Sequence, residues 1–226
     1  MRKLEDYALP DGPFCGVDEA GRGPVMGPIV IAAVMVDDDR ELRKLCVKDS
    51  KKLTPQRRQE LLPKIIEISR YEIISASASD IDALRQSMTM NVMESKLFAT
   101  VIERLGAKVA YVDAADTDED LFGRYISKEL KGAVKIISKH GADDTYPVVS
   151  AASIIAKTKR DAMIEEIKLE LGDIGSGYPS DPKTINFLKA WYTDHGEMPP
   201  HTRKSWKTVD RIISELSITK LETFKD

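Results

Sequence analysis

Long apolar runs are absent from this sequence. The longest, Ile29–Val36, is far too short to span a membrane. The first residues include Arg2 and Lys3 but then turn acidic, without the apolar core of a secretory signal. We therefore expect no membrane-spanning segment and a cytoplasmic protein.

The sequence also has few cysteines and no excess of positive charge. The 226 residues include two cysteines, Cys15 and Cys46, which fit a reduced cytosolic protein. No spacing of cysteine and histidine is typical of a zinc site. The formal net charge of -3 argues against a uniformly basic nucleic-acid binder, so any such binding must come from local patches.

The remaining composition is that of an ordinary globular protein, with 42% hydrophobic and 31% charged residues. The length fits one domain of generous size, or one domain with a helical extension. We find no internal repeat and no low-complexity linker.

The chain is organised around residues 16–28, where two adjacent carboxylates, Asp18 and Glu19, end a short apolar run. A glycine-rich turn and the second apolar run, Ile29–Val36, follow, which predicts strand, turn and strand. Adjacent strand residues face opposite ways, so the two acids can share a site only where the strand ends or bulges. The glycine spacing excludes a dinucleotide fingerprint and a P-loop. A plain turn and a ligand-binding turn both remain open.

Apolar periodicity and capping residues predict alternating helices and short strands after the initial hairpin. Thr54 and Pro55, for example, are typical of a helix start. Such alternation implies a mixed sheet with helices on its faces. The predicted strands lie near 14–19, 27–36, 71–76, 108–112 and 134–137, and the predicted helices cover 40–45, a segment from 55, 79–85, 91–105, 119–130, 147–171, 182–194 and 208–217.

Acidic residues fall at three places where strands meet loops: Asp18 with Glu19, Asp113, and Asp143 with Asp144. Converging carboxylates repel one another unless a cation joins them. Oxygen ligands suit Mg²⁺ or Mn²⁺, and two such ions about 4 Å apart can drive phosphodiester cleavage. A capping or loop role is the alternative for Asp113, and a favourable place at a helix start is the alternative for Asp143 and Asp144.

Several longer motifs occur in order between about residues 14 and 210. The motifs are Gly16-Val17-Asp18-Glu19-Ala20-Gly21-Arg22-Gly23-Pro24, Lys48-Asp49-Ser50-Lys51-Lys52-Leu53, Tyr111-Val112-Asp113, Ala142-Asp143-Asp144-Thr145-Tyr146-Pro147-Val148-Val149-Ser150-Ala151-Ala152-Ser153-Ile154, Gly175-Ser176-Gly177-Tyr178-Pro179-Ser180-Asp181-Pro182 and Ser205-Trp206-Lys207-Thr208. Together they resemble ribonuclease HII, the type 2 ribonuclease H, in a compact archaeal-like form.

The resemblance implies the ribonuclease H-like fold of the α/β class, a five-stranded mixed sheet flanked by helices with a helical C-terminal extension. It implies a lead-in over 1–13, a catalytic core over 14–172, a helical substrate-binding part over 173–216 and a tail over 217–226.

The resemblance also implies the catalytic and metal-binding residues, which are Asp18, Glu19, Asp113 and Asp143. Asp143 is preferred over its neighbour because the family pattern is Ala-Asp-x-x-Tyr-Pro. Many relatives carry His-Lys-Ala-Asp, whereas this chain has Gly141 in place of the lysine. Two Mg²⁺ or Mn²⁺ ions are expected with substrate.

The implied reaction is endonucleolytic hydrolysis of RNA in RNA–DNA hybrids, or at a ribonucleotide embedded in duplex DNA. It leaves 3′-hydroxyl and 5′-phosphate ends. Discrimination must rest on the ribose 2′-hydroxyl. We expect a monomer, with substrate bound by Gly21, Arg22, Gly23, Lys48, Ser50, Lys51, Tyr178 and Lys207.

Three basic clusters could hold the nucleic-acid backbone if they line one groove. Each is a solvated charge run by default. The clusters are Lys48, Lys51 and Lys52; Lys157, Lys159 and Arg160; and Arg203, Lys204 and Lys207.

Two rival functions remain: another two-metal nuclease on the same fold, and a non-catalytic hybrid-binding protein.

The tail over 217–226 places Leu221 and Phe224 three residues apart, on one face of a helical turn. Both could fold back onto the core. Alternatively, the tail resembles the short motif by which DNA-repair enzymes bind the sliding clamp, although Ile218 stands where that motif opens with glutamine.

Overall fold

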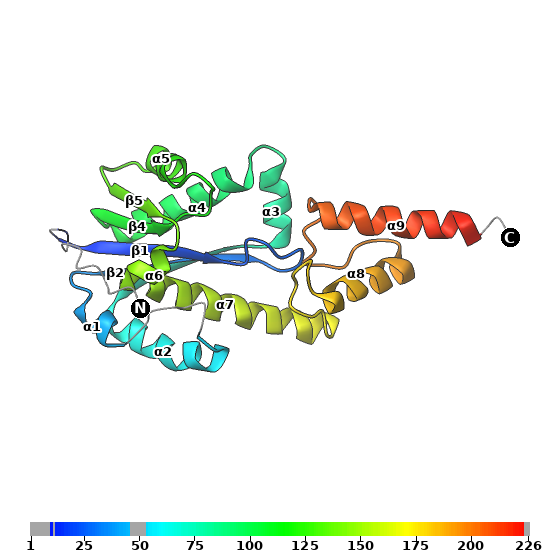
Figure 1. The fold of residues 1–226 in the computed structure, drawn as a ribbon, viewed down its shortest axis with the longest axis horizontal. Helices are drawn as coiled ribbons and strands as arrows, with labels where there is room; N and C mark the ends of the chain where they lie inside the picture. The colour runs from blue at the N-terminus through cyan, green and yellow to red at the C-terminus, as the bar shows by residue number, and fades with distance from the viewer. Residues whose placement is uncertain (1–9, 11, 46–52, 224–226) are drawn as a thin grey trace. The chain divides into compact units, whose positions relative to one another are not determined.

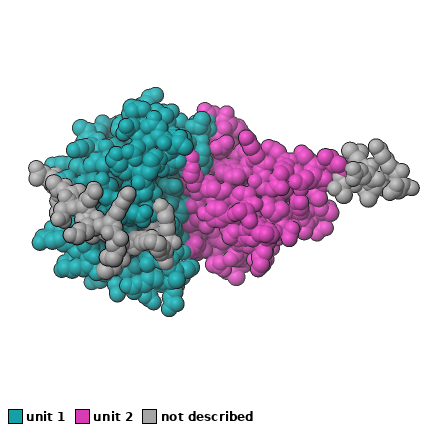
Figure 2. Space-filling model, viewed as in Figure 1, with its two compact units in different colours: residues 1–20, 30–75, 88–159 teal, residues 21–29, 76–87, 160–226 magenta. Residues whose placement is uncertain are grey.

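A computed structural model describes residues 10, 12–45 and 53–223, and it divides the chain into two compact units (Figure 2). The first unit comprises residues 1–20, 30–75 and 88–159, and the second comprises residues 21–29, 76–87 and 160–226. Lys48, Ser50, Lys51 and Phe224, which the sequence assigns to substrate or clamp binding, lie outside the described residues.

The first unit is built on a five-stranded sheet in the order β3-β2-β1-β4-β5. Strand β1 pairs antiparallel with β2 and parallel with β4, and β4 pairs parallel with β5. The predicted mixed sheet is therefore confirmed. The strands are β1 (Phe14–Ala20), β2 (Ile29–Val36), β3 (Arg70–Ala76), β4 (Val109–Asp113) and β5 (Lys135–Lys139).

Helices cover both faces of this sheet. Figure 1 shows α4 (Met90–Leu105) and α5 (Glu119–Glu129) on one side, and α1 (Arg40–Lys44), α2 (Pro55–Ile68) and the start of α7 (Pro147–Leu171) on the other. All eight residues of β2 are buried, as a strand covered on both faces requires. The predicted start of α2 is confirmed, because the Thr54 side chain accepts a hydrogen bond from the Arg57 amide at 3.2 Å.

Helix α7 packs directly against the central strand β1. A Cβ added at Gly16 would lie 2.2 Å from the Val148 carbonyl carbon and the Val149 nitrogen, so only glycine fits between strand and helix. The facing turns of the helix carry small buried residues, Ala151, Ala152 and Ser153. These small residues allow α7 to lie close to the sheet.

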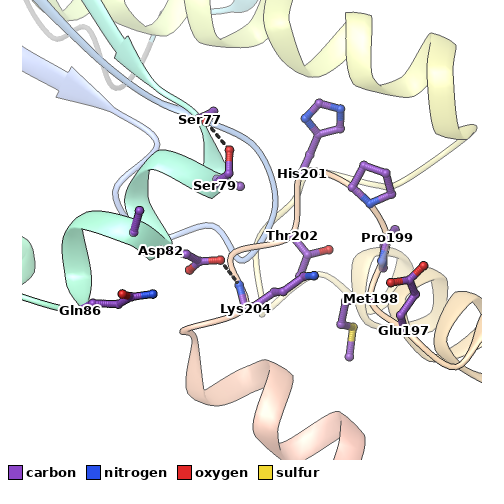
Figure 3. Close-up of a pocket in the computed structure, with 13 residues that line it drawn as sticks. Ser77, Ser79, Asp82, Gln86, Glu197, Met198, Pro199, His201, Thr202 and Lys204 are labelled. Carbon is purple, nitrogen blue, oxygen red and sulfur yellow. Dashed lines mark hydrogen bonds between the residues drawn. The ribbon is translucent and has the colours of Figure 1, made fainter.

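The second unit consists of α3 (Ala78–Arg85), the end of α7, α8 (Pro182–His195) and α9 (Lys207–Thr223), with residues 21–29. Within it, a pocket of about 650 Å³ lies between α3 and residues 197–204 (Figure 3). The apolar core of the second unit contains Val25, Met26, Ile164, Ile167, Ile174, Leu188, Met198, Val209 and Ile212. The predicted boundaries of the catalytic core at residue 172 and of the substrate-binding part at residue 216 stay a prediction.

Two elements differ from the sequence prediction. A one-turn helix, α6 (Ala142–Thr145), precedes α7 where a loop was expected. Helix α9 runs on to Thr223, beyond the predicted end near residue 217, because no glycine or proline interrupts it. Over the ranges given above, no helix is both long and apolar enough to cross a membrane.

Candidate active site

Three aspartates from distant parts of the chain converge in the first unit. Asp18, Asp113 and Asp143 each offer a carboxylate oxygen, and these oxygens lie within 4.8 Å of one another. Asp18 lies near the end of β1, Asp113 is the last residue of β4, and Asp143 lies in α6. Because β1 and β4 are parallel neighbours, their carboxyl ends meet at one edge of the sheet.

The third aspartate is positioned by main-chain geometry. Gly141 has a left-handed φ of 64° and is the N-cap residue of α6, a conformation that glycine adopts readily. The next amide, that of Ala142, donates to Asp113 Oδ1 at 2.9 Å. This bond ties β4 to α6 and leaves Asp143 buried and Asp144 exposed. The preference for Asp143 therefore has a structural basis.

The electrostatics of Asp18 favour a bound cation. Burial raises the pKa of its carboxyl well above the usual value, and the charges of Glu19 and Asp113 raise the pKa further. A hydrogen bond from Ser153 and the charge of Lys157 lower the pKa but do not offset these effects. A divalent cation would stabilise all three carboxylates, and an all-oxygen ligand set suits Mg²⁺ or Mn²⁺.

Glu19 is placed differently from the other predicted acids. It is not among the three carboxylates that converge within 4.8 Å. Asp18 pairs with Ala32 and Glu19 with Ile31, so the regular pairing of β1 with β2 continues through both acids. Glu19 nevertheless acts on Asp18 through its charge, and its amide donates to Asp18 Oδ1 at 2.7 Å. Its role as a metal ligand stays a prediction.

Two residues beside the acids were not predicted as catalytic-site residues. Ser153 and Lys157 lie one turn apart on α7, and Lys157 Nζ donates to Ser153 Oγ at 2.8 Å. From the sequence, Lys157 was predicted only as a member of a basic cluster, and Ser153 was assigned no role. The i, i+4 spacing on the helix that covers the Asp18 face is the signal that could have found this pair.

The glycine-rich turn begins immediately after β1 and belongs to the second unit. Gly21 has a φ of 92°, and a Cβ there would lie 2.5 Å from the Pro28 carbonyl oxygen, so this position requires glycine. Gly23 is exposed, and a Cβ there would lie 3.6 Å from Cε1 of Tyr178. The structure therefore brings the predicted turn and the predicted tyrosine together.

Tyr178 lies on a turn that is bonded to the same segment. The Gly177 carbonyl accepts from the amide of Val25 at 2.8 Å, and the Arg160 guanidinium lies 5.3 Å from the centre of the tyrosine ring. Tyr178 as a whole remains 39% exposed. The turn is thus fixed by its hydrogen bond to Val25, while part of Tyr178 stays accessible to a ligand.

The cluster of Lys48, Lys51 and Lys52 lies outside the described residues, and the other two basic clusters are only partly exposed to solvent. Lys204 and Lys207 are exposed, but Arg160 is 7% exposed and Arg203 is fully buried. The default interpretation of these two arginines as solvated charges is therefore wrong, whereas phosphate binding by the clusters stays a prediction.

Comparison with known proteins gives consistent matches. The family model described as Ribonuclease HII matches residues 15–209. The chain belongs to the ribonuclease HII family. A Ribonuclease HII from Thermococcus kodakarensis is 47% identical, over 92% of each chain. The structure of the ribonuclease H2 from Pyrococcus horikoshii superposes with a TM-score of 0.84 at 41% identity, over 90% of this chain and 98% of that one. The RNase HII of Archaeoglobus fulgidus, solved in a PCNA:RNase HII complex, gives 0.82 at 42% identity, over 88% and 96%.

Membership in this family confirms the ribonuclease H-like fold and the resemblance to archaeal members. It makes the chain an enzyme with ribonuclease H activity, an endonuclease that acts on RNA–DNA hybrids. The rival view of a non-catalytic binding protein is not supported.

Proposed function

We propose that this ribonuclease HII hydrolyses RNA in hybrids and also cuts duplex DNA at single embedded ribonucleotides, leaving 3′-hydroxyl and 5′-phosphate ends. The observation that carries the proposal is the convergence of Asp18, Asp113 and Asp143 within 4.8 Å at one edge of the sheet. Three carboxylates this close, two of which are buried, need a cation to be charged together. The enzyme works as a cytoplasmic monomer.

In the proposed mechanism, two Mg²⁺ or Mn²⁺ ions would be held by Asp18, Glu19, Asp113 and Asp143. Such a pair would stabilise the attacking and leaving oxygens of the phosphodiester. The chain's own groups orient the ligands: Ser153 donates to Asp18, and the Ala142 amide fixes Asp113. Lys157 offsets part of the excess negative charge, since its ammonium lowers the pKa of Asp18.

Sugar selection is assigned to Gly21, Arg22, Gly23 and Tyr178. The backbone of the turn can approach a ribose closely because Gly23 is exposed and has no side chain. Tyr178 presents an exposed ring beside that glycine, suited to packing against the sugar. Only the 2′-hydroxyl distinguishes the ribose from a deoxyribose, so selection requires donors or acceptors directed at that group.

Backbone phosphates are assigned to Lys48, Ser50, Lys51 and Lys207. Lys207 is exposed at the start of α9. Cation–phosphate contacts position the duplex without reading sequence, and their contribution falls as salt rises. Such local contacts are compatible with a net charge of -3.

Cleavage mapping on duplex DNA with one ribonucleotide tests the proposal. Asp18→Asn should abolish most cleavage while the protein remains folded, because an amide cannot supply the charge that holds the ions. Asp144→Asn is the matched control: it is the same substitution in the exposed neighbour of Asp143, and its effect should be small. Equal losses in both variants, or equal cutting of an all-DNA duplex, would contradict the assignment.

A sliding clamp is a second proposed partner, favoured by the PCNA complex of the Archaeoglobus fulgidus relative. Leu221 and Phe224 at the end of the chain would carry the contact, and tethering would raise the local concentration of enzyme at DNA. Clamp binding by the intact chain should disappear when residues 217–226 are deleted, with cleavage of free hybrid preserved. Lost thermal stability on deletion, without clamp binding by the intact chain, would favour docking of the tail on the core.

A further inference from the structure

A buried arginine behind the glycine-rich turn has three main-chain partners. Arg203 Nε donates to the Gly27 carbonyl at 2.9 Å, Nη1 to the Arg22 carbonyl at 2.9 Å, and Nη2 to the Gly21 carbonyl at 2.5 Å. The side chain is fully buried, and its guanidinium lies 4.9 Å from the centre of the Trp206 ring. One planar cation therefore holds the carbonyls at both ends of the turn.

These contacts determine where the amides of the turn point. In a trans peptide unit, the N–H is directed opposite to the C=O of the same unit. The Gly21 carbonyl shares its peptide unit with the Arg22 amide, and the Arg22 carbonyl shares its unit with the Gly23 amide. Because Arg203 draws both carbonyls inward, both amides are directed away from it. These are two of the backbone groups to which sugar selection is assigned.

Arg203 is itself held firmly in place. Its amide donates to the Val25 carbonyl at 2.8 Å, and the Gly27 amide donates to the His201 carbonyl at 2.8 Å. On the other side, Asp82 accepts from the amides of Lys204 at 2.7 Å and Ser205 at 3.0 Å, as Figure 3 shows for Lys204. The segment on either side of the arginine is thus fixed to the turn and to α3.

The position is electrostatically unfavourable for a cation. Burial, and next the charge of Arg160, lower the pKa of the Arg203 guanidinium to about 9. A buried charged group usually adds little to the stability of the fold, and a specific geometric role is the better-attested explanation for its presence. His201, two residues away, has a φ of 63° and is the one non-glycine residue with a positive φ in the part of the chain that the structure describes. Strained backbone of this kind is found at functional sites.

We infer that Arg203 is a positioning residue for ribose recognition: its three bonds to carbonyls aim the amides of Arg22 and Gly23 at the substrate. The inference rests on the proposed function, which assigns sugar selection to this turn. Lysine cannot replace the arginine, because its single ammonium lacks the planar fork that spans three carbonyls.

The test compares Arg203→Lys with Arg211→Lys, the same substitution at an exposed arginine on α9 that pairs with Glu215. Both are introduced into the full chain with Asp18→Asn to prevent cleavage. The measured quantity is the ratio of dissociation constants for duplex DNA with and without one ribonucleotide. Arg203→Lys should reduce the preference for the ribonucleotide about tenfold, the effect of losing about one hydrogen bond. Arg211→Lys should leave the ratio unchanged.

A purely structural role would lower thermal stability without changing this ratio. A ratio unchanged by Arg203→Lys therefore refutes the inference and leaves the proposed function intact. Equal binding of both duplexes by the protein with Arg203 intact refutes the sugar-selecting function instead. If Arg203→Lys does not fold, Asp82→Asn decides: it loosens the segment that carries Arg203 without removing the cation, and a reduced ratio supports the inference while an unchanged ratio refutes it.

Discussion

Replacing Gly16 with alanine should damage both the stability and the activity of this enzyme. The added Cβ would lie 2.2 Å from two backbone atoms of α7, those of Val148 and Val149. Carbon atoms in contact are normally separated by about 3.5 Å or more, so strand and helix must separate by about 1.3 Å. The obstacle is backbone and cannot rotate away. Overpacking of this kind costs about 1–3 kcal/mol, and we expect the upper end here.

Thermal unfolding is the first assay. For a chain of this length, each kcal/mol changes the melting temperature by about 2–4 °C, so about 3 kcal/mol predicts a fall of about 6–12 °C. Gly132→Ala is the matched control, because a Cβ at Gly132 meets nothing within 4 Å. The free energy of unfolding of Gly132→Ala should differ from that of the wild type by no more than about 0.5 kcal/mol, so its melting temperature should hardly change.

Activity at a temperature where both variants are folded is the second assay. Movement of α7 displaces Ser153 and Lys157, which lower the pKa of Asp18. A displacement of about 1 Å at a catalytic group can reduce kcat about 100-fold, while KM should change less. A Gly16→Ala protein as stable and as active as Gly132→Ala would refute the reasoning.

Two further predictions concern the acids and the tyrosine. In EDTA, Asp18→Asn should raise the melting temperature at neutral pH. The pKa of the Asp18 carboxyl is raised in the folded protein, so the contribution of this group to stability is full at low pH and is lost as pH rises through the folded-state pKa. A variant no more stable than wild type at high pH would contradict this. Tyr178→Ala should reduce cleavage at a single ribonucleotide more than binding to hybrids, and Tyr178→Phe should lose only a hydroxyl contact, so unchanged rates on both substrates would remove Tyr178 from the site.

Local signals in the sequence were sufficient for most elements. Thr54 and Pro55 marked the start of α2, and the apolar run before Asp18 marked β1. The acids could be grouped because parallel strands bring their ends to one edge of the sheet. These inferences depend on neighbours along the chain or on a general rule of sheet geometry.

Burial of charged residues could not be inferred in this way. In the sequence, Arg203 stands beside Lys204 and Lys207 like another exposed cation, and Arg160 follows Lys157 and Lys159. Their burial depends on contacts with residues elsewhere in the chain: Arg203 donates to the carbonyl groups of Gly21 and Arg22, and Arg160 donates to the carbonyl group of Ser176. The same applies to the grouping of residues 21–29 with residues 160–226, which depends on pairing between Met26 and Thr202.

The origin of the three aspartates in separate elements also bears on synthesis. A chain that is leaving the ribosome forms its N-terminal parts first. The hairpin of β1 and β2 then carries Asp18 alone, and the cation site requires β4 and finally α6, which follows the last strand. An interrupted chain that ends before α6 lacks Asp143 and has no complete cation site. Only a chain that extends through α6 can therefore hold the cation and reach activity.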